Sequence, residues 1–290
     1  MNAMVGYEPR ARRVALPARG GEMAVLDFGP PERPADVVFS HANGFNGRTY
    51  RTILAPLAAR LRILAIDLRG HGASTLPAVV EGRAGWDEFR DDLLALLAAE
   101  TRGPVVLAGH SMGGTSSLLA AAAAPERVKG LALFDPVVFT PSQRPSAMGD
   151  NPLAEGALRR RALFPSKAAA VEAYTGRGAF RSWRPEQLAD YVEAGFRESG
   201  DGQVTLTCTP AWEASNFRTH NYDPWAAFRA TQCPVRILRA EHGSTARLEE
   251  GQAELEATGR FRIEVIAGAS HFLPMERPEL VRDLLLEMTA

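Results

Sequence analysis

Residues 105–124 read VVLAGHSMGGTSSLLAAAAA, an apolar run that breaks abruptly and continues as an alanine-rich segment. A break of this kind is typical of a serine that lies in a sharp turn between a buried strand and a helix. The turn forces Ser111 into a strained backbone conformation, and only Gly109 and Gly113 leave room for strand and helix to pass so closely. The motif therefore predicts a nucleophilic hydroxyl on Ser111, above the edge of a sheet. A chance turn that contains a serine is the alternative.

Strand-like and helix-like segments alternate on both sides of this motif. Eight runs rich in Val, Ile and Leu are expected to be strands: residues 11–16, 22–28, 36–41, 62–67, 104–109, 128–135, 234–240 and 261–266. Stretches with helical periodicity separate most of them from the third onward: 49–60, 86–100, 112–124, 248–258 and 277–288. This alternation is typical of a parallel sheet with helices on both faces. The first two runs have no helix between them, which predicts an antiparallel edge.

The interval from Pro136 to Phe228 interrupts the alternation. It contains several helix-like pieces, among them ALRRRALF, SKAAAVEAYTGRG and RPEQLADYVEAGF, and no convincing strand. A structureless loop of this length is improbable inside a compact domain, so the interval predicts a helical cap. We expect a core domain of residues 1–136 and 229–290 and a cap of residues 137–228, with a separate, independently functioning domain as the alternative.

A small-residue bend follows the third strand, with the sequence SHANGF at residues 40–45. Acyl transfer requires two preorganised N–H donors for the oxyanion of its tetrahedral intermediate. The residue after the nucleophile, Met112, supplies one candidate N–H, and Asn43 in the bend supplies the other. An ordinary strand-exit turn is the alternative.

A general base is also required, and His271 follows the last strand in a loop. From there its ring can reach a serine at the same edge of the sheet, accept the hydroxyl proton and return it to the leaving group. His71 lies between Gly70 and Gly72 in a sharp turn and is interpreted as a structural residue.

These motifs together resemble the α/β-hydrolase superfamily: GHSMGG around Ser111, HANGF at 41–45, DLRGHGAS at 67–74 and GASHFLPMERP at 268–278. The resemblance covers nearly the whole chain. It implies the α/β-hydrolase fold, with an eight-stranded, mostly parallel sheet, helices on both faces and a helical cap inserted after the sixth strand. It also implies a catalytic serine, acid and histidine in that chain order.

The acid departs from the pattern of the superfamily. Many members carry an aspartate in the loop after the seventh strand, where this chain has glycine in RAEHGS at residues 239–244. Two carboxylates remain as candidates to orient His271. Asp135 ends the sixth strand, where some members carry their acid, and Glu241 lies one to two residues before the usual position. We favour Asp135, although an aspartate that only caps the turn into Pro136 is the structural alternative.

A serine nucleophile disfavours the dehalogenase and epoxide hydrolase chemistries of similar capped proteins, which use aspartate. It favours acyl-enzyme chemistry on a small, partly apolar carboxylic ester, thioester or lactone, with no metal or cofactor. The alternatives are a ligand-binding pseudoenzyme on the same fold, and a C–C bond hydrolase or cofactor-free haloperoxidase with the same triad. Cap residues would select the substrate, and the candidates for the pocket wall are Trp183, Trp212, Phe217 and His220.

The amino-acid composition limits the classes of molecule that the protein is expected to bind. The 290 residues include 33 Lys plus Arg against 34 Asp plus Glu, and neither sign forms a long block, which argues against nucleic acid and anionic membranes. A small-molecule substrate is therefore expected. Two cysteines, Cys208 and Cys233, imply no disulfide framework, and no signal-peptide pattern opens the sequence, so a cytoplasmic location is expected. The oligomeric state stays open, with a homodimer among the alternatives.

Overall fold

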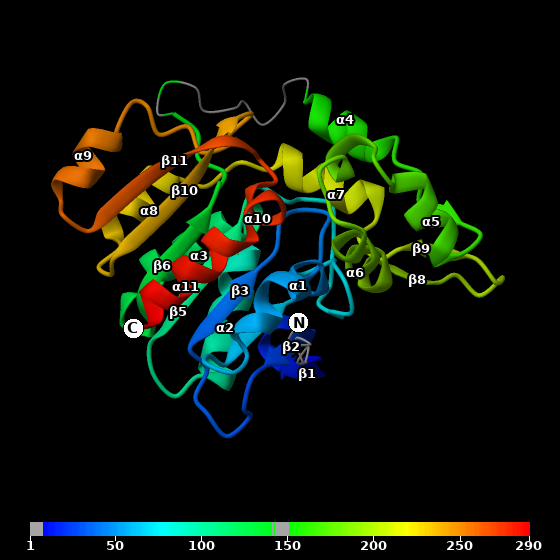
Figure 1. The fold of residues 1–290 in the computed structure, drawn as a ribbon, viewed down its shortest axis with the longest axis horizontal. Helices are drawn as coiled ribbons and strands as arrows, with labels where there is room; N and C mark the ends of the chain where they lie inside the picture. Colours follow the sequence, from blue (N-terminus) through cyan, green and yellow to red (C-terminus); the bar gives the residue numbers. More distant parts are fainter. Residues whose placement is uncertain (1–7, 141, 143–150) are drawn as a thin grey trace, which may run out of the picture.

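The computed structural model describes residues 8–140, 142 and 151–290. Residues 1–7, 141 and 143–150, which fall in the predicted core and cap ranges, lie outside the described residues. Within the described part, the core is an eight-stranded sheet with the order β1-β2-β4-β3-β5-β6-β10-β11 (Figure 1). Its strands are β1 (Arg10–Leu16), β2 (Gly21–Phe28), β3 (Val37–Ser40), β4 (Ile63–Ile66), β5 (Val105–His110), β6 (Val128–Phe134), β10 (Val235–His242) and β11 (Phe261–Ser270).

The sheet has the predicted mixed character. β1 pairs antiparallel with β2, and β2 pairs antiparallel with β4, whereas the strands from β4 to β11 pair in parallel. Every residue of β3, β4 and β5 is buried, which explains why these strands read as continuous apolar runs rather than as alternating ones. The predicted fold, with its mostly parallel eight-stranded sheet, is confirmed.

Helices cover both faces of this sheet (Figure 1). One apolar core contains side chains of α2 (Asp87–Glu100), α3 (Met112–Ala123), α8 (Pro224–Ala230) and α9 (Gln252–Ala257). The core on the other face contains side chains of α1 (Arg51–Leu54), α10 (Leu273–Glu276) and α11 (Pro278–Thr289). Burial of these two apolar layers is the main favourable contribution to folding.

Two predicted core helices are shorter than expected. The helix over residues 49–60 is a 3-10 turn (Gly47–Tyr50), the four residues of α1, and a second 3-10 turn (Ala55–Leu57). Pro56 lies in that second turn, where it lacks the N–H that a continuing α-helix needs. The helix over residues 248–258 is reduced to α9, because Gly251 before it is in a non-helical conformation with φ −140° and ψ 5°.

The interval between β6 and β10 contains α4 (Pro152–Leu158), α5 (Lys167–Tyr174), α6 (Pro185–Gly195), α7 (Pro210–Arg218) and α8. The expectation of no strand there is wrong, because a three-stranded antiparallel sheet joins β7 (Leu163–Phe164), β9 (Val204–Leu206) and β8 (Phe196–Glu198). The rings of Phe164 and Phe196 pack with centroids 5.5 Å apart. The segment ALRRRALF accordingly ends α4 and begins β7 instead of forming one helix.

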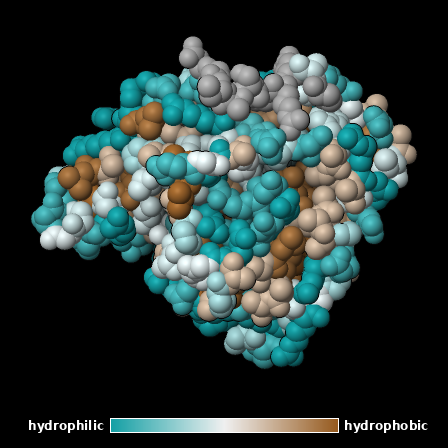
Figure 2. Space-filling model, turned by 180° about the vertical axis from the view of Figure 1, so that it is seen from behind, coloured by the Kyte–Doolittle hydropathy of each residue, from teal (hydrophilic) through white to brown (hydrophobic). Residues whose placement is uncertain are grey.

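The four helices α4 to α7 lie together at one side of the sheet, whereas α8 packs against α3 of the core (Figure 1). The domain boundary at residue 228 stays a prediction. The face turned away from the viewer in Figure 1 is largely hydrophilic, with apolar side chains gathered in a hollow (Figure 2). Within the described residues, no helix combines the length and the apolar character needed to cross a membrane.

Candidate active site

Ser111 lies between the last residue of β5 and the first residue of α3, with φ 54° and ψ −121°. This strained conformation is held by close packing of the two elements. A Cβ on Gly109 would lie 2.5 Å from the backbone of Gly113. A Cβ on Gly113 would lie 2.5 Å from the carbonyl oxygen of His41 and closer still to that of Ser40. The two glycines thus have the steric role that the sequence motif predicts.

The structure brings Ser111, His271 and Asp135 into one chain of hydrogen bonds. Oγ of Ser111 lies 3.1 Å from Nε2 of His271, and Nδ1 of His271 lies 2.6 Å from Oδ2 of Asp135. A carboxylate accepts but does not donate, so the Asp135 contact places the histidine proton on Nδ1. Nε2 is then free to accept the hydroxyl proton of Ser111.

Asp135 is buried, with a left-handed backbone at φ 45° that directs its side chain toward the ends of β10 and β11. Oδ1 accepts hydrogen bonds from the N–H of Ala240 at 2.9 Å and the hydroxyl of Ser244 at 2.6 Å. Oδ2 also accepts from the N–H of Thr245 at 3.0 Å. Burial alone would raise the pKa of Asp135, but these donors and His271 lower its pKa to about 2. The carboxylate is therefore ionised at neutral pH.

The side chain of Glu241, the other candidate acid, points away from His271. Its side chain is 47% exposed, and its Oε2 accepts a hydrogen bond from the N–H of Gly268 at 2.8 Å. A second contact, 3.3 Å to Nε2 of His242, is also at the surface. The structure therefore places Asp135, and not Glu241, at His271.

His110, which the sequence analysis left without a role, connects the serine turn to the histidine loop. Its Nε2 donates to the carbonyl oxygen of His271 at 2.7 Å, and its Nδ1 accepts from the hydroxyl of Tyr50 at 2.8 Å. Complete burial, together with the nearby His271, lowers the pKa of His110 to about 3. His110 is thus a neutral side chain that holds the backbone of His271 in place.

Asn43 and Met112, the predicted oxyanion donors, line the same cavity as Ser111. Met112 is the first residue of α3, and the first N–H groups of a helix have no acceptor within the helix. The loop that carries Asn43 is fixed by His71, whose Nε2 accepts from the N–H of Gly44 at 3.1 Å. Burial lowers the pKa of His71 to about 4, so this ring is neutral and stays an acceptor. The structure thus gives His71 a supporting position beside the loop.

The cavity at Ser111 has a volume of about 520 Å³. Its apolar lining comes from loops and helices at the carboxyl edge of the large sheet and from the interval between β6 and β10: Ala42, Phe45, Trp86, Met112, Val137, Val138, Phe139, Leu153, Ala179, Phe217 and Phe272. Of the four expected wall residues, Phe217 and His220 line the cavity. Trp212 instead packs in the core, with Nε1 donating to the carbonyl oxygen of Arg69 at 3.0 Å. Trp183 packs edge-on to Phe45 with ring centroids 5.2 Å apart.

Two charged side chains besides the histidine and its partners line this cavity. Glu213 is neutralised by Arg160, whose Nη1 lies 2.5 Å from its carboxylate. Arg247 is exposed, and among the described residues its guanidinium has no hydrogen-bond or ion-pair partner. Its backbone is fixed, because its N–H donates to the carbonyl oxygen of Val138 at 3.0 Å. The cavity therefore combines a largely apolar wall with the positive charge of Arg247, which lies near enough to Glu249 to help lower the pKa of that carboxyl.

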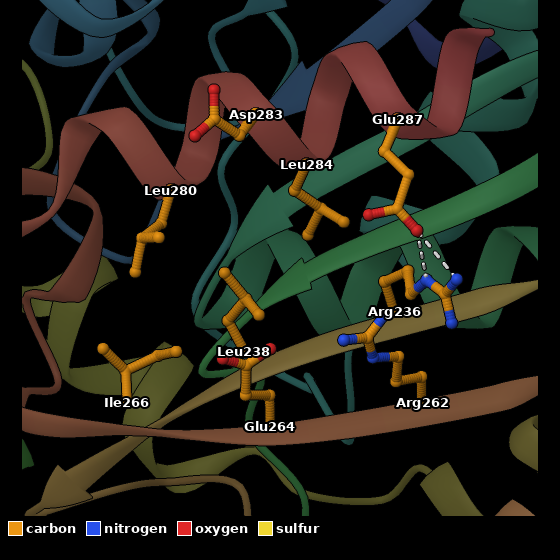
Figure 3. Close-up of a pocket in the computed structure, with 9 residues that line it drawn as sticks. All are labelled: Arg236, Leu238, Arg262, Glu264, Ile266, Leu280, Asp283, Leu284 and Glu287. Atoms are coloured by element: carbon orange, nitrogen blue, oxygen red, sulfur yellow. Dashed lines mark hydrogen bonds and ion pairs between the residues drawn. The ribbon is translucent and has the colours of Figure 1, made fainter.

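A second hollow, of about 150 Å³, lies between α11 and the strands β10 and β11 (Figure 3). The ion pair between Arg236 and Glu287, at 2.7 Å, closes one end of it, and Leu280 and Ile266 lie at the other. None of its nine lining residues is a serine, cysteine or histidine. The candidate residues Ser111 and His271 line the other cavity.

Comparisons with known proteins identify the family of the chain. A 2-(acetamidomethylene)succinate hydrolase of Mesorhizobium japonicum is 27% identical over 84% of each chain, and carboxylesterase YbfK of Bacillus subtilis is 24% identical over 92% of this chain and 84% of its own length. The crystal structure of an E-2-(acetamidomethylene)succinate hydrolase shares the fold, with TM-score 0.78 and 24% identity over 97% of this chain and all of the other. The model of the alpha/beta hydrolase family matches residues 37–284, and the chain therefore belongs to this family.

Proposed function

We propose that the protein is a serine hydrolase that cleaves a small, partly apolar carboxylic ester through an acyl-enzyme. Ser111 is the nucleophile, His271 the general base and Asp135 the acid that orients it. The observation that carries the proposal is the hydrogen-bond chain from the Ser111 hydroxyl through both ring nitrogens of His271 to a buried, ionised carboxylate. Such a chain is the arrangement that activates serine for acyl transfer.

The reaction would proceed in two halves. Nε2 of His271 accepts the hydroxyl proton as Oγ of Ser111 attacks the acyl carbon, and the N–H groups of Asn43 and Met112 stabilise the oxyanion. His271 then donates the proton to the departing alkoxide, which leaves the acyl group on Ser111. A water molecule, deprotonated by the same ring, attacks the acyl carbon of the acyl-enzyme. The ring then returns that proton to Oγ of Ser111 as the bond to the acyl carbon breaks and the acid leaves. Asp135 stays ionised throughout and stabilises the imidazolium.

The lining of the cavity supports a partly apolar substrate. Aromatic and aliphatic side chains surround Ser111, and about 520 Å³ suits a small molecule rather than a polymer. Thioesters and lactones present the same acyl carbon and belong to the same proposal. The similarity to a carboxylesterase of Bacillus subtilis supports an ester substrate.

Arg247 favours a second candidate function, the hydrolysis of a substrate that carries a free carboxylate. An unpaired guanidinium at the edge of a largely apolar cavity can bind such a group in a bidentate manner. Thr245, two residues before it, contacts Nδ1 of His271 at 3.4 Å, and the Cα of Arg247 lies within about 7 Å of the Cα of Thr245. The relative from Mesorhizobium japonicum acts on a compound named as a succinate with an acetamido group.

A fluorophosphonate probe tests the nucleophile, because it phosphonylates an activated serine irrespective of the natural acyl group. Intact-mass spectrometry should show one adduct on the wild type and none on Ser111→Ala. An unlabelled wild type that also leaves p-nitrophenyl acetate intact would favour a ligand-binding protein on this fold. To separate the two candidate substrates, p-nitrophenyl butyrate is compared with the p-nitrophenyl hemiester of succinate in wild type and Arg247→Gln. If Arg247 binds a carboxylate of the substrate, Arg247→Gln should raise KM for the hemiester and leave KM for the butyrate unchanged.

A further inference from the structure

The side chain of Asn43 is held at both ends by the cap helix α7. Its Nδ2 donates to the backbone carbonyl oxygen of Glu213 at 3.0 Å. Its Oδ1 accepts from Nδ2 of Asn216 at 2.8 Å. A single asparagine in the oxyanion loop thus makes two hydrogen bonds to a helix that lies about 170 residues further along the chain. The Asn43 side chain thus receives these two polar contacts from α7.

Asn216 is itself fully buried and held in one orientation. Its Oδ1 accepts from Nη1 of Arg83 at 2.7 Å, and its backbone oxygen accepts from Nε1 of Trp86 at 3.2 Å. A guanidinium only donates, so the oxygen of the Asn216 amide must face Arg83 and the nitrogen must face Asn43. The direction of the hydrogen bond to Asn43 is therefore determined by chemistry.

Arg83 anchors this arrangement in the core of the protein. Its Nε donates to Glu88 of α2 at 2.5 Å, and its guanidinium carbon lies 3.9 Å from the centre of a ring of Trp212. Its Nη1 also donates to the hydroxyl of Ser215 at 2.5 Å. A continuous polar path thus runs from α2 through Arg83 and Asn216 to Asn43.

The peptide between Asn43 and Gly44 is also restricted by its neighbours. Gly44 has φ 75°, and a Cβ there would lie 2.6 Å from the carboxylate of Glu213. Its N–H is held by His71 from the core side. The peptide between Asn43 and Gly44 is therefore held by His71 on the core side and faces Glu213 of α7 on the other side.

We propose that Asn216 is a positioning residue, which acts through the Asn43 side chain to direct the Asn43 backbone N–H at the oxyanion. The oxyanion hole is then complete only while α7 is docked on the loop, so cap position and catalytic competence are coupled. The inference rests on the proposed function. It adds a role for the cap in stabilising the transition state, beyond selection of the substrate.

The steady-state kinetics of Asn216→Ala, Asn216→Asp and Asn43→Ala test it with p-nitrophenyl butyrate. Each should lower kcat about 10- to 100-fold with little change in KM, because misdirecting one oxyanion donor affects only the transition state. Asn216→Asp keeps an acceptor for Arg83 but has no N–H for Asn43, and its buried carboxylate faces Oδ1 of Asn43. It should show the loss of kcat at temperatures well below its own thermal midpoint, where the variant is folded. Ser215→Ala, which removes another Arg83 contact on α7 without touching Asn43, is the matched control and should keep wild-type kcat.

Two further measurements distinguish positioning from a general loosening of the fold. Affinity for a trifluoromethyl ketone, which forms a tetrahedral adduct with serine, should fall in parallel with kcat. The double variant Asn216→Ala, Asn43→Ala should be no slower than Asn43→Ala alone, since both changes remove the same link.

The inference is overturned if Asn216→Asp keeps wild-type kcat and ketone affinity, or if the variants change only KM. It is also overturned if the effects of Asn216→Ala and Asn43→Ala on kcat multiply in the double variant. A wild type without Ser111-dependent turnover overturns the proposed function first, and the inference with it. A wild type with Ser111-dependent turnover, whose Asn216 variants are unaffected, overturns the inference alone.

Discussion

Nε2 of His110 donates a hydrogen bond to the carbonyl oxygen of His271, across 2.7 Å. The bond joins the residue before the candidate nucleophile to the backbone of the candidate base, although 161 positions separate them in the chain. Tyr50 completes the contact through its hydroxyl, which lies 2.8 Å from Nδ1 of His110. The distance between Ser111 and His271 is thus set by a buried, neutral histidine that lies outside the hydrogen-bond chain to Asp135.

We expect His110→Ala to lower both stability and activity. It leaves the Tyr50 hydroxyl and the His271 carbonyl oxygen without their partner, which should cost about 3 kcal/mol of unfolding free energy. The loop that carries His271 is then less restrained, and kcat should fall by up to about 100-fold. A displacement of the general base by about 1 Å is enough to lower the rate by this factor. Urea unfolding and ester turnover measure the two effects. His242→Ala, at an exposed position, is the control, and an equal response of both variants would contradict the account.

Asp135→Asn should lower kcat by about 10³- to 10⁴-fold with little change in KM. The amide cannot stabilise the imidazolium and favours the wrong tautomer of His271. Glu241→Gln should have wild-type kinetics, since Glu241 contacts the N–H of Gly268 and not the ring of His271. Steady-state kinetics of the two variants decide between the two carboxylates, and the opposite ranking would reject Asp135 as the acid.

Gly113→Ala should lower the thermal midpoint by at least about 10 °C or prevent folding, because its methyl group would overlap the backbone of Ser40 and His41. The control is Gly156→Ala in α4, where nothing lies within 4 Å of the added carbon. There alanine should stabilise the helix by about 0.5–1 kcal/mol. Thermal unfolding followed by circular dichroism tests both, and equal midpoints for the two variants would argue against the close passage of β5 and α3.

The stabilising contribution of neutral His71 should be lost as the pH drops from about 6.5 to 4. The pKa of His71 is about 4 in the folded protein, against an ordinary value of 6.5, so in this window the unfolded chain binds a proton that the folded chain does not. The contribution of His71 is about 3 kcal/mol. Burial raises the pKa of Asp67 to about 6, which acts in the opposite direction.

A comparison of wild type with His71→Gln isolates the histidine, because Asp67 is common to both proteins. The difference between their unfolding free energies should shrink by about 3 kcal/mol from pH 7 to pH 4. Urea titrations across this range measure it. A difference that stays constant with pH would mean that His71 is accessible to protons in the folded state.

The parts of the fold that the sequence predicts correctly depend on local patterns. The eight core strands and α3 follow from apolar runs and from the glycines around Ser111, since burial and sterics act within a few residues there. The two- and three-residue strands of the cap have no such local signal. β7 and β8 form because Phe164 and Phe196 meet, and this contact joins segments 32 residues apart.

The candidate site also contains residues that local sequence patterns predict and residues that they do not. Ser111 and His271 lie together as their motifs predict, whereas the choice between Asp135 and Glu241 depends on the backbone direction at each residue. The left-handed turn at Asp135 and its contact with the end of β10 decide it, and neither is visible in the sequence.

The supporting residues carry weaker signals. The position of His110 directly before Ser111 hints at a role, but the sequence does not show which carbonyl oxygen its ring reaches. Trp86 lines the cavity from the position just before α2, and Asn216 holds Asn43 from α7. The residue pattern around each resembles that of ordinary packing.

The central claim, that Ser111 is an activated nucleophile, is tested most directly by p-nitrophenyl butyrate hydrolysis in wild type, Ser111→Ala and Ser116→Ala. Ser116 is a buried serine of α3 whose hydroxyl donates to the backbone carbonyl oxygen of Met112, so its variant controls for general effects on the helix. The account predicts turnover by wild type and Ser116→Ala, and a fall in kcat of about 10⁴-fold or more in Ser111→Ala. Equal turnover by wild type and Ser111→Ala would contradict it.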